Sequence, residues 1–126
     1  MELIIGGAFQ GKGAYAKKKY PDIQWLEGGS IGEEELFTAR GVVNFQEYIR
    51  REMRSGGDVT KLGERLAEAN PDVVLVSCEI GYGVVPMDAF DRAYREAVGR
   101  ICTVLAAKSR RVTRVVCGIG TVIKDA

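Results

Sequence analysis

The stretch Glu2-Leu3-Ile4-Ile5-Gly6-Gly7-Ala8-Phe9-Gln10-Gly11-Lys12-Gly13 decides the fold, because it joins an apolar strand directly to a glycine-rich loop. Residues 6–13, called here the phosphate loop, match the pattern G-x-x-x-x-G-K-[ST] at every fixed position except the last. Backbone N–H groups in such a loop, together with the start of the following helix, form a cradle for an anion. Lys12 would bring its ammonium to a β- or γ-phosphate, so the pattern predicts that a nucleotide binds here.

All positions of this loop are candidates for nucleotide contact: Gly6, Gly7, Ala8, Phe9, Gln10, Gly11, Lys12 and Gly13. Gly13 stands where the pattern has Ser or Thr, whose hydroxyl normally helps to hold Mg²⁺. The sequence therefore supports nucleotide binding better than turnover. The structural alternative is a glycine-rich turn with no ligand, which the position directly after the first strand makes the weaker interpretation.

Length and composition describe one small domain over residues 1–126. Hydrophobic residues make up 46% of the chain, which is enough to bury a core. Eighteen basic and seventeen acidic residues leave no strongly basic face, so nucleic acid is not expected as a partner. Cys78, Cys102 and Cys117 lie among apolar residues and are expected to be reduced core residues. Since no apolar run reaches membrane-spanning length and no signal-peptide pattern is present, we expect a cytoplasmic protein with no membrane span.

Strand and helix patterns alternate along the chain. Strands are predicted over residues 2–5, 23–26, 72–78 and 112–117, and helices over residues 14–20, 42–54, 59–69 (capped by Asp58) and 86–109. We expect residues 31–40 to be partly helical and residues 118–124 to form a turn and a short extended tail. The alternation predicts an α/β fold, specifically a P-loop NTPase-like three-layer sandwich with a mostly parallel sheet.

A second segment whose residues could take part in the chemistry is Cys-Glu-Ile-Gly-Tyr-Gly-Val-Val-Pro at residues 78–86. It follows the clearest central strand, so we expect it beside the phosphate loop at the carboxyl edge of the sheet. Glu79 would coordinate Mg²⁺ through water or accept a proton from an attacking hydroxyl, which makes Lys12 and Glu79 the candidate catalytic residues and Glu79 the candidate metal ligand. The alternative, an ion pair between Glu79 and a basic neighbour, stays open.

Several segments, in the right order along the chain, resemble one known family. They are residues 4–7 with Gly11-Lys12, residues 73–86, residues 94–96 with Gly99-Arg100, residues 115–120 and Ile123-Lys124. Together they are similar to the adenosylcobinamide kinase/adenosylcobinamide-phosphate guanylyltransferase family. The resemblance covers the first twenty or so residues and roughly the last fifty-five, whereas residues 28–57 are dissimilar.

The resemblance implies a P-loop protein of cobalamin biosynthesis that uses GTP or ATP with Mg²⁺. Members of this family phosphorylate the aminopropanol hydroxyl of adenosylcobinamide and then transfer GMP from GTP through a guanylylated histidine. A nucleotide and a corrinoid are the implied ligands, and a homo-oligomer is the implied assembly. Arg95 and Arg100 on the long helix become candidate triphosphate contacts, with surface ion pairs as the alternative.

The chain departs from the family pattern at positions that affect the chemistry. It contains no histidine, so a guanylylated histidine cannot form on it. Gly13 replaces the hydroxyl residue of the loop, and Ile101-Cys102-Thr103 replaces the asparagine-glutamine pair that the family usually has there. Two hypotheses follow. The protein is either a kinase-like phosphotransferase without guanylyltransferase chemistry, or a catalytically degenerate subunit that binds a nucleotide or a corrinoid.

Overall fold

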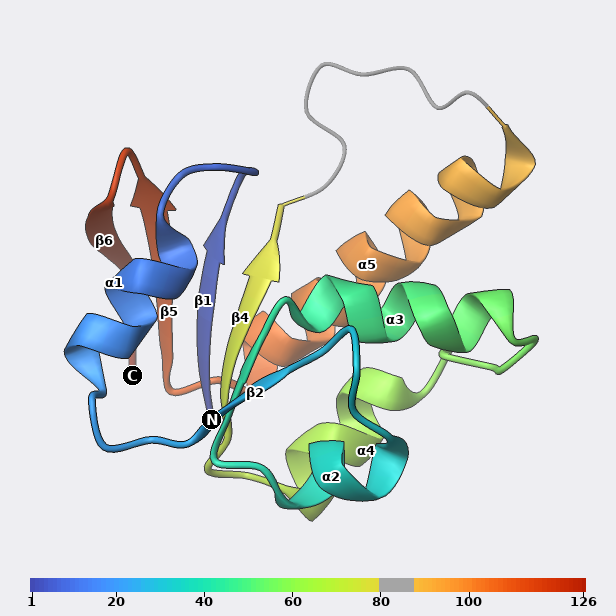
Figure 1. Ribbon diagram of the computed structural model, residues 1–126, viewed down its shortest axis with the longest axis horizontal. Coiled ribbons are helices and arrows are strands. Elements are labelled where there is room, and N and C mark those ends of the chain that lie inside the picture. The colour runs from blue at the N-terminus through green and yellow to red at the C-terminus, as the bar shows by residue number, and fades with distance from the viewer. Residues whose placement is uncertain (80–87) are drawn as a thin grey trace.

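The computed structural model describes residues 1–79 and 88–126, and Figure 1 shows how their elements are arranged. The strands are β1 (Glu2–Gly6), β2 (Trp25–Glu27), β3 (Gly41–Val43), β4 (Val74–Cys78), β5 (Arg111–Val116) and β6 (Ile119–Asp125). The helices are α1 (Lys12–Lys19), α2 (Glu33–Thr38), α3 (Phe45–Arg54), α4 (Leu62–Ala69) and α5 (Ala89–Lys108).

The strands form one sheet in the order β2-β3-β4-β1-β5-β6. All neighbouring pairs are parallel except β5 and β6, which are antiparallel. This arrangement confirms the predicted α/β fold with a mostly parallel sheet. The phosphate loop follows the end of β1, so it leaves the sheet at the carboxyl edge, where ligands bind in open parallel sheets. The strand order makes β1 an interior strand, between β4 and β5.

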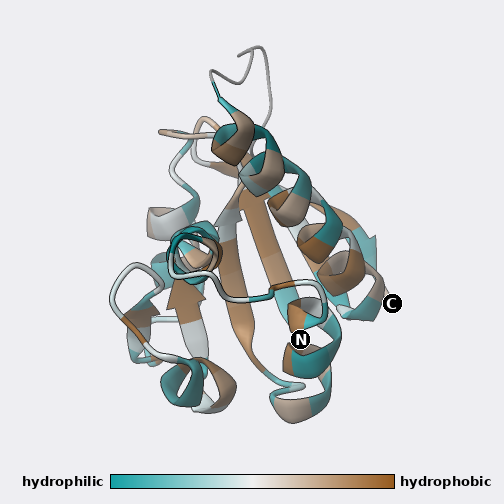
Figure 2. Ribbon diagram, turned by 90° about the vertical axis from the view of Figure 1, so that its right-hand side faces the viewer, coloured by the Kyte–Doolittle hydropathy of each residue, from teal (hydrophilic) through white to brown (hydrophobic). Residues whose placement is uncertain are grey.

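Helices cover both faces of the sheet, which gives the predicted three layers. Figure 1 shows α1 on one face and α3, α4 and α5 on the other, and Figure 2 shows the apolar strands between them. The smaller core, on the α1 face, includes Ile4, Ala16, Val76 and Val115. The larger core, on the opposite face, includes Leu3, Phe45, Ile49, Leu66, Leu75, Leu105 and Val112. Since side chains alternate along a strand, neighbouring residues of β1 serve opposite cores.

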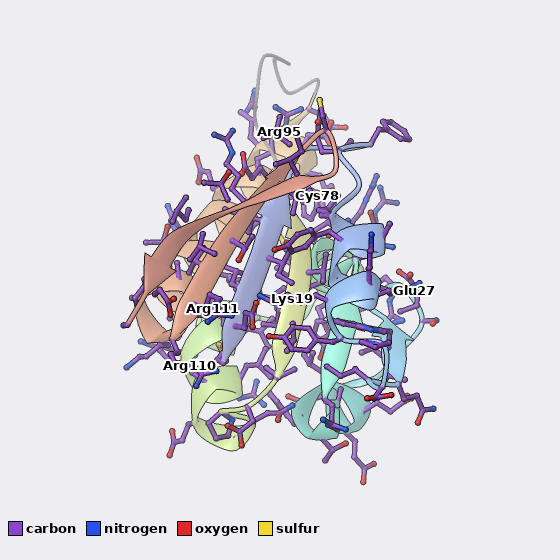
Figure 3. All side chains as sticks on the ribbon, turned by 90° about the vertical axis from the view of Figure 1, so that its left-hand side faces the viewer. Lys19, Glu27, Cys78, Arg95, Arg110 and Arg111 are labelled. Carbon is purple, nitrogen blue, oxygen red and sulfur yellow. The ribbon has the colours of Figure 1, made fainter. Side chains whose placement is uncertain are left out.

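The two ends of the sheet differ in character. At the amino end Glu2 is buried, and its carboxylate accepts hydrogen bonds from Lys19 Nζ at 3.1 Å and from the Tyr20 hydroxyl. Figure 3 places Arg110 and Arg111 near this end and Cys78 toward the other. The paired charges at the amino end stabilise the start of the sheet.

Residues 41–43 form a strand, so the prediction of a helix over residues 42–54 is wrong for its first turn. Val42 and Phe45 have helical spacing, but Gly41–Val43 is buried and pairs with β2 and β4. Asn44, with φ of 53°, turns the chain into α3. Pairing on both sides outweighs the local helical pattern.

The helix predicted from Val59 begins at Leu62, and Asp58 does not cap it. The carboxylate of Asp58 instead accepts the backbone N–H of Thr60 at 2.9 Å. Asp58 therefore forms a local turn with Thr60, and this hydrogen bond lies before the first residue of α4.

The end of the chain is a full edge strand, not a short tail. β6 pairs with β5, and Cys117 and Gly118 form the tight turn between them, with φ of 52° and 76°. Two-residue hairpin turns require such positive φ values. Cys117 is exposed, so the prediction that it is a core residue is wrong, whereas Cys78 and Cys102 are partly buried.

The long helix α5 confirms the helix predicted in this region, and its buried face includes Tyr94, Ile101 and Leu105. Asp88 caps it by accepting the backbone N–H of Asp91 at 2.8 Å, so the helix begins at Ala89. The predicted start at residue 86 lies outside the described residues. Across residues 1–79 and 88–126, none of the helices combines the length and the apolar character needed to cross a membrane.

Candidate phosphate-binding site

The phosphate loop follows β1 and ends in the first turn of α1. A Cβ on Gly6 would lie 2.7 Å from the carbonyl oxygen of Val115 in β5, so only glycine fits between the two strands. Gly11 has φ of 83° and precedes Lys12, the first residue of α1. Gly6 lets β1 lie close against β5, and Gly11 turns the backbone so that the loop meets the amino end of a helix, where backbone N–H groups favour an anion.

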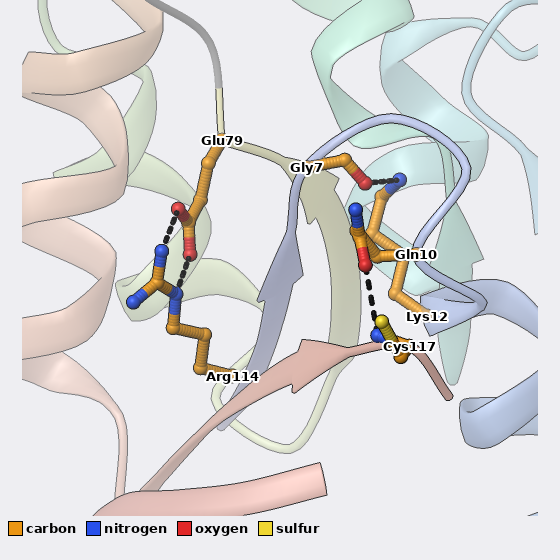
Figure 4. Close-up of polar contacts among 6 residues, drawn as sticks. All are labelled: Gly7, Gln10, Lys12, Glu79, Arg114 and Cys117. Carbon is orange, nitrogen blue, oxygen red and sulfur yellow. Dashed lines mark hydrogen bonds and ion pairs between the residues drawn. The ribbon is translucent and has the colours of Figure 1, made fainter. Parts of the chain in front are cut away.

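Lys12 is buried, with 8% of its surface exposed. Its ammonium donates a hydrogen bond to the carbonyl oxygen of Gly7 at 3.3 Å, and Figure 4 shows it turned back onto the loop. The positive charge therefore lies within the loop itself, and the contact of Lys12 with a phosphate stays a prediction.

Gln10 ties the loop to the β5–β6 turn through two hydrogen bonds. The backbone N–H of Cys117 donates to Gln10 Oε1 at 2.8 Å, and the backbone N–H of Gly118 donates to the Gln10 carbonyl oxygen at 2.7 Å. Figure 4 shows the first of these contacts. The hairpin thus braces the loop from the side opposite β4, a role that sequence reasoning missed because residues 118–124 were expected to be a short tail.

The remaining loop positions lie at the surface. Ala8 is exposed, and the Phe9 side chain is fully exposed with φ of 62°. Gly13 has open space around it, since a Cβ there would meet nothing within 4 Å. The loop therefore presents backbone to solvent on its outer side, and its nucleotide contacts stay a prediction.

Glu79 forms a bidentate ion pair with Arg114. Arg114 Nε lies 2.9 Å from Glu79 Oε1, and Arg114 Nη2 lies 3.2 Å from Glu79 Oε2 (Figure 4). The backbone N–H of Glu79 also donates to the carbonyl oxygen of Gly6 at 2.7 Å, so this carboxylate is fixed beside the start of the loop. The alternative of an ion pair with a basic neighbour thus describes the structure, while the catalytic and metal roles of Glu79 stay predictions.

Sequence reasoning did not single out Arg114, although a signal for it exists. Arg114 interrupts the apolar pattern of β5 between Val112 and Val115, and a charged residue inside an interior strand needs a partner. The partner could not be identified from the sequence, because it depends on β1 lying between β4 and β5.

The structure places Arg95 and Arg100 on α5. Arg95 lies toward the same end of the molecule as Cys78 (Figure 3). Arg100 is exposed, pairs with Glu96 at 3.5 Å and lines a cavity of about 110 Å³ between α4 and α5. Among the described residues no recorded contact joins Arg100 to the phosphate loop, so its nucleotide role stays a prediction.

Cys102 occupies part of the segment that replaces the family's asparagine-glutamine pair. Burial raises the pKa of its thiol, and the thiol lies 3.8 Å from the Ser77 hydroxyl. A thiol held neutral in this way is a poor nucleophile. Cys102 therefore does not supply a ready substitute for the missing histidine.

Among the described residues, Glu79 is the carboxylate held beside the start of the phosphate loop, so a magnesium ion there would be held through it. Gly13 offers no hydroxyl, and Glu27 is bound to Asn44 Nδ2 at 2.9 Å on β2, which β3 and β4 separate from β1. No group of three His, Cys, Asp or Glu side chains suited to a metal exists in the described part of the chain, and residues 80–87 contain none of these residue types. Since Mg²⁺ on a nucleotide needs only one or two carboxylates besides phosphates and water, Glu79 suffices, provided that Arg114 releases it.

The mostly parallel sheet, with a lysine-bearing glycine-rich loop at the end of an interior strand, defines an α/β protein with a P-loop-like fold. Comparison with known proteins extends this: the cobinamide kinase / cobinamide phosphate guanyltransferase family matches residues 34–123. The chain belongs to this family. The match includes residues 34–57, which had appeared dissimilar, and does not include the phosphate loop.

Two curated relatives agree with this assignment. The bifunctional adenosylcobalamin biosynthesis protein CobU of Escherichia coli (strain K12) is 35% identical over 78 residues, which are 62% of this chain and 43% of the relative. The protein of the same name from Salmonella typhimurium (strain LT2) is 46% identical over 52 residues, 41% of this chain and 29% of the relative. The chain thus matches less than half the length of either relative.

Proposed function

We propose that residues 1–126 form one domain that binds GTP or ATP on the phosphate loop and transfers a phosphoryl group to the hydroxyl of adenosylcobinamide or a similar alcohol. The observation that carries this proposal is the position of Lys12, which is buried at the first residue of α1 with its ammonium on the loop backbone. Membership of the cobinamide kinase / cobinamide phosphate guanyltransferase family supplies the reaction class.

In the proposed reaction the alcohol oxygen attacks the γ-phosphorus, and the bond from that phosphorus to the β–γ bridging oxygen breaks. The hydroxyl proton passes to Glu79 or to water. Loop N–H groups and Lys12 hold the triphosphate and neutralise its charge, which is most of what catalysis of this transfer needs. Magnesium bound to the nucleotide would add charge neutralisation, with Glu79 as its contact through water, and we propose Arg95 and Arg100 as further phosphate contacts.

Guanylyl transfer through histidine is not part of this proposal, because the chain contains no histidine. A second candidate function is a degenerate subunit that binds a nucleotide or a corrinoid without turnover. Two observations favour it: Gly13 lacks the loop hydroxyl, and Arg114 occupies the carboxylate of Glu79.

We also propose that the protein works in the cytoplasm as a homo-oligomer. Light scattering of the purified chain measures its assembly, and a monomer at working concentration would contradict this part of the proposal.

Calorimetric titration with GTP and ATP, each with and without Mg²⁺, tests the main proposal. We expect binding by the wild type and a loss of at least about tenfold in affinity for Lys12→Ala, since charge-assisted bonds to phosphate are worth roughly 1.5–3 kcal/mol. Phosphorylation of adenosylcobinamide then separates the kinase from the binding subunit. Absence of binding at millimolar nucleotide, or equal affinity for Lys12→Ala, would overturn the phosphate-loop assignment.

A further inference from the structure

The Glu79–Arg114 ion pair spans β1 at the point where the phosphate loop begins. Glu79 directly follows β4 and Arg114 lies in β5, the two strands that flank β1. Arg114 is in register with Ile5, and Glu79 is hydrogen-bonded to Gly6. The pair therefore lies beside Gly6, the first residue of the loop, on the face of the sheet opposite the one that α1 covers.

The exposure of the two partners is unequal. The Arg114 side chain is 44% exposed, whereas the Glu79 side chain is 14% exposed. Glu79 is also anchored through its backbone, as described above. The Arg114 side chain is thus the more accessible partner, and Glu79 is the more fixed one.

The chemistry of arginine makes a change of partner available. A guanidinium presents five N–H donors in a planar fork that fits a carboxylate and a phosphate equally well. A triphosphate on the loop would bring several negatively charged oxygens to the end of β1, next to a guanidinium that is already paired with one carboxylate. Phosphate and Glu79 then compete for the same donors.

We propose that Arg114 is a phosphate contact that Glu79 holds in place until the ligand arrives. Binding transfers the guanidinium from the Glu79 carboxylate to phosphate oxygen, and this exchange releases Glu79. The inference rests on the proposed function, because it requires that a phosphate ligand binds on the loop. It adds a residue to the site and explains how Glu79 becomes available when the ligand is present.

Competition predicts opposite effects for the two halves of one ion pair. Arg114→Ala removes a ligand contact, so affinity for pyrophosphate in EDTA falls about 10- to 100-fold. Glu79→Gln removes the competing charge and keeps the size of the side chain, so affinity in EDTA rises about three- to tenfold. A purely structural ion pair would destabilise the fold in both variants and leave affinity unchanged in both.

The experiment is calorimetric titration of the whole chain with pyrophosphate, then with GTP, in EDTA. It compares the wild type, Arg114→Ala, Arg114→Lys, Glu79→Gln and Lys12→Ala. Arg110→Ala is the matched control, because Arg110 is an exposed arginine just before the amino end of β5. Thermal unfolding of each variant verifies that it is folded at the titration temperature.

Opposite shifts for Arg114→Ala and Glu79→Gln, with Arg114→Lys between the wild type and Arg114→Ala, support the exchange. If the wild type binds, Lys12→Ala fails to bind and both ion-pair variants match Arg110→Ala, the exchange is overturned while the proposed function stands. If the wild type binds neither pyrophosphate nor GTP, the proposed function falls and the exchange with it.

Discussion

At the scale of single residues, two glycines of the phosphate loop exist for different reasons. Gly6 is required by packing, because any side chain would collide with the backbone of β5. Gly13 is not required by packing, because a Cβ there meets nothing within 4 Å. Packing therefore does not explain why glycine replaces serine or threonine at position 13, and a hydroxyl residue can be introduced there by substitution.

Gly13→Ser should restore the complete loop pattern without disturbing the fold. We expect Mg²⁺ to strengthen GTP binding more in this variant than in the wild type, by roughly three- to tenfold, because the added hydroxyl is the missing metal contact. Titration with and without Mg²⁺ measures the difference. Gly13→Ala is the control, since it adds a Cβ but no oxygen, and an equal Mg²⁺ effect in both variants would contradict the prediction.

Gly28 provides a residue-scale test of packing at the carboxyl end of β2. A Cβ there would lie 2.3 Å from the carbonyl oxygen of Asn44, so the backbone would have to move. We expect Gly28→Ala to lower the free energy of unfolding by about 2 kcal/mol, measured by urea denaturation.

Gly99 is the matched control for that measurement. It lies inside α5, and a Cβ there meets nothing within 4 Å. Gly99→Ala should raise the free energy of unfolding by about 0.5–1 kcal/mol, because alanine restricts the unfolded chain. If both alanine substitutions changed the free energy of unfolding in the same direction, the packing argument for Gly28 would fail.

At the scale of elements, the β5–β6 hairpin supports the phosphate loop. Part of the loop lies open to solvent, since its exposed residues include Phe9. Gln10 joins it to the turn at Cys117 and Gly118, so the geometry of the loop depends on a hairpin that is distant in sequence.

Gln10→Ala should loosen this support while leaving the sheet intact. We expect the amide of Cys117 to exchange with solvent faster, and GTP affinity to fall about three- to tenfold, because one of two bracing hydrogen bonds is lost. Hydrogen exchange followed by mass spectrometry, together with titration, measures both effects. Gln24→Ala at an exposed position is the control; if its effects equal those of Gln10→Ala, the hairpin does not support the loop.

The elements also show what the sequence could and could not predict. β1, the loop and β4 were predicted because apolar runs and glycines act locally. β3 was missed because a three-residue strand with helical apolar spacing is recognisable only once its neighbours pair with it. The partner of Glu79 could not be predicted for the same reason. Arg114 in β5 meets Glu79 after β4 only because both strands lie next to β1 in the sheet.

At the scale of the whole molecule, we expect buried Tyr48 and partly buried Tyr20 to make stability depend on pH in the alkaline range. Burial, followed by the carboxylates of Glu52 and Glu33, raises the pKa of Tyr48 to about 12. Burial and the hydrogen bond to Glu2 raise the pKa of Tyr20 to about 12. In the unfolded chain a tyrosine hydroxyl has a pKa near 10. The higher pKa values in the folded state mean that the folded protein binds these protons more tightly than the unfolded chain does.

Stability should therefore be complete below pH 10 and decline as the pH rises toward 12. Urea denaturation at pH 8, 10 and 11 measures the free energy of unfolding. Tyr48→Phe removes one titrating hydroxyl and should flatten the decline relative to the wild type. A decline equally steep in that variant would assign the alkaline sensitivity to other groups.

The sheet order has a consequence for how the protein is made. β1 and the loop are synthesised first, yet both strands that flank β1 come later, at residues 74–78 and 111–116. The hydrogen bond between Gln10 and Cys117 joins residues 107 positions apart. Contacts of such long range form only after the later segment has been synthesised. The loop therefore reaches its braced geometry only once the β5–β6 turn exists, and a chain terminated before β5 carries the loop sequence without the strand and the turn that support it.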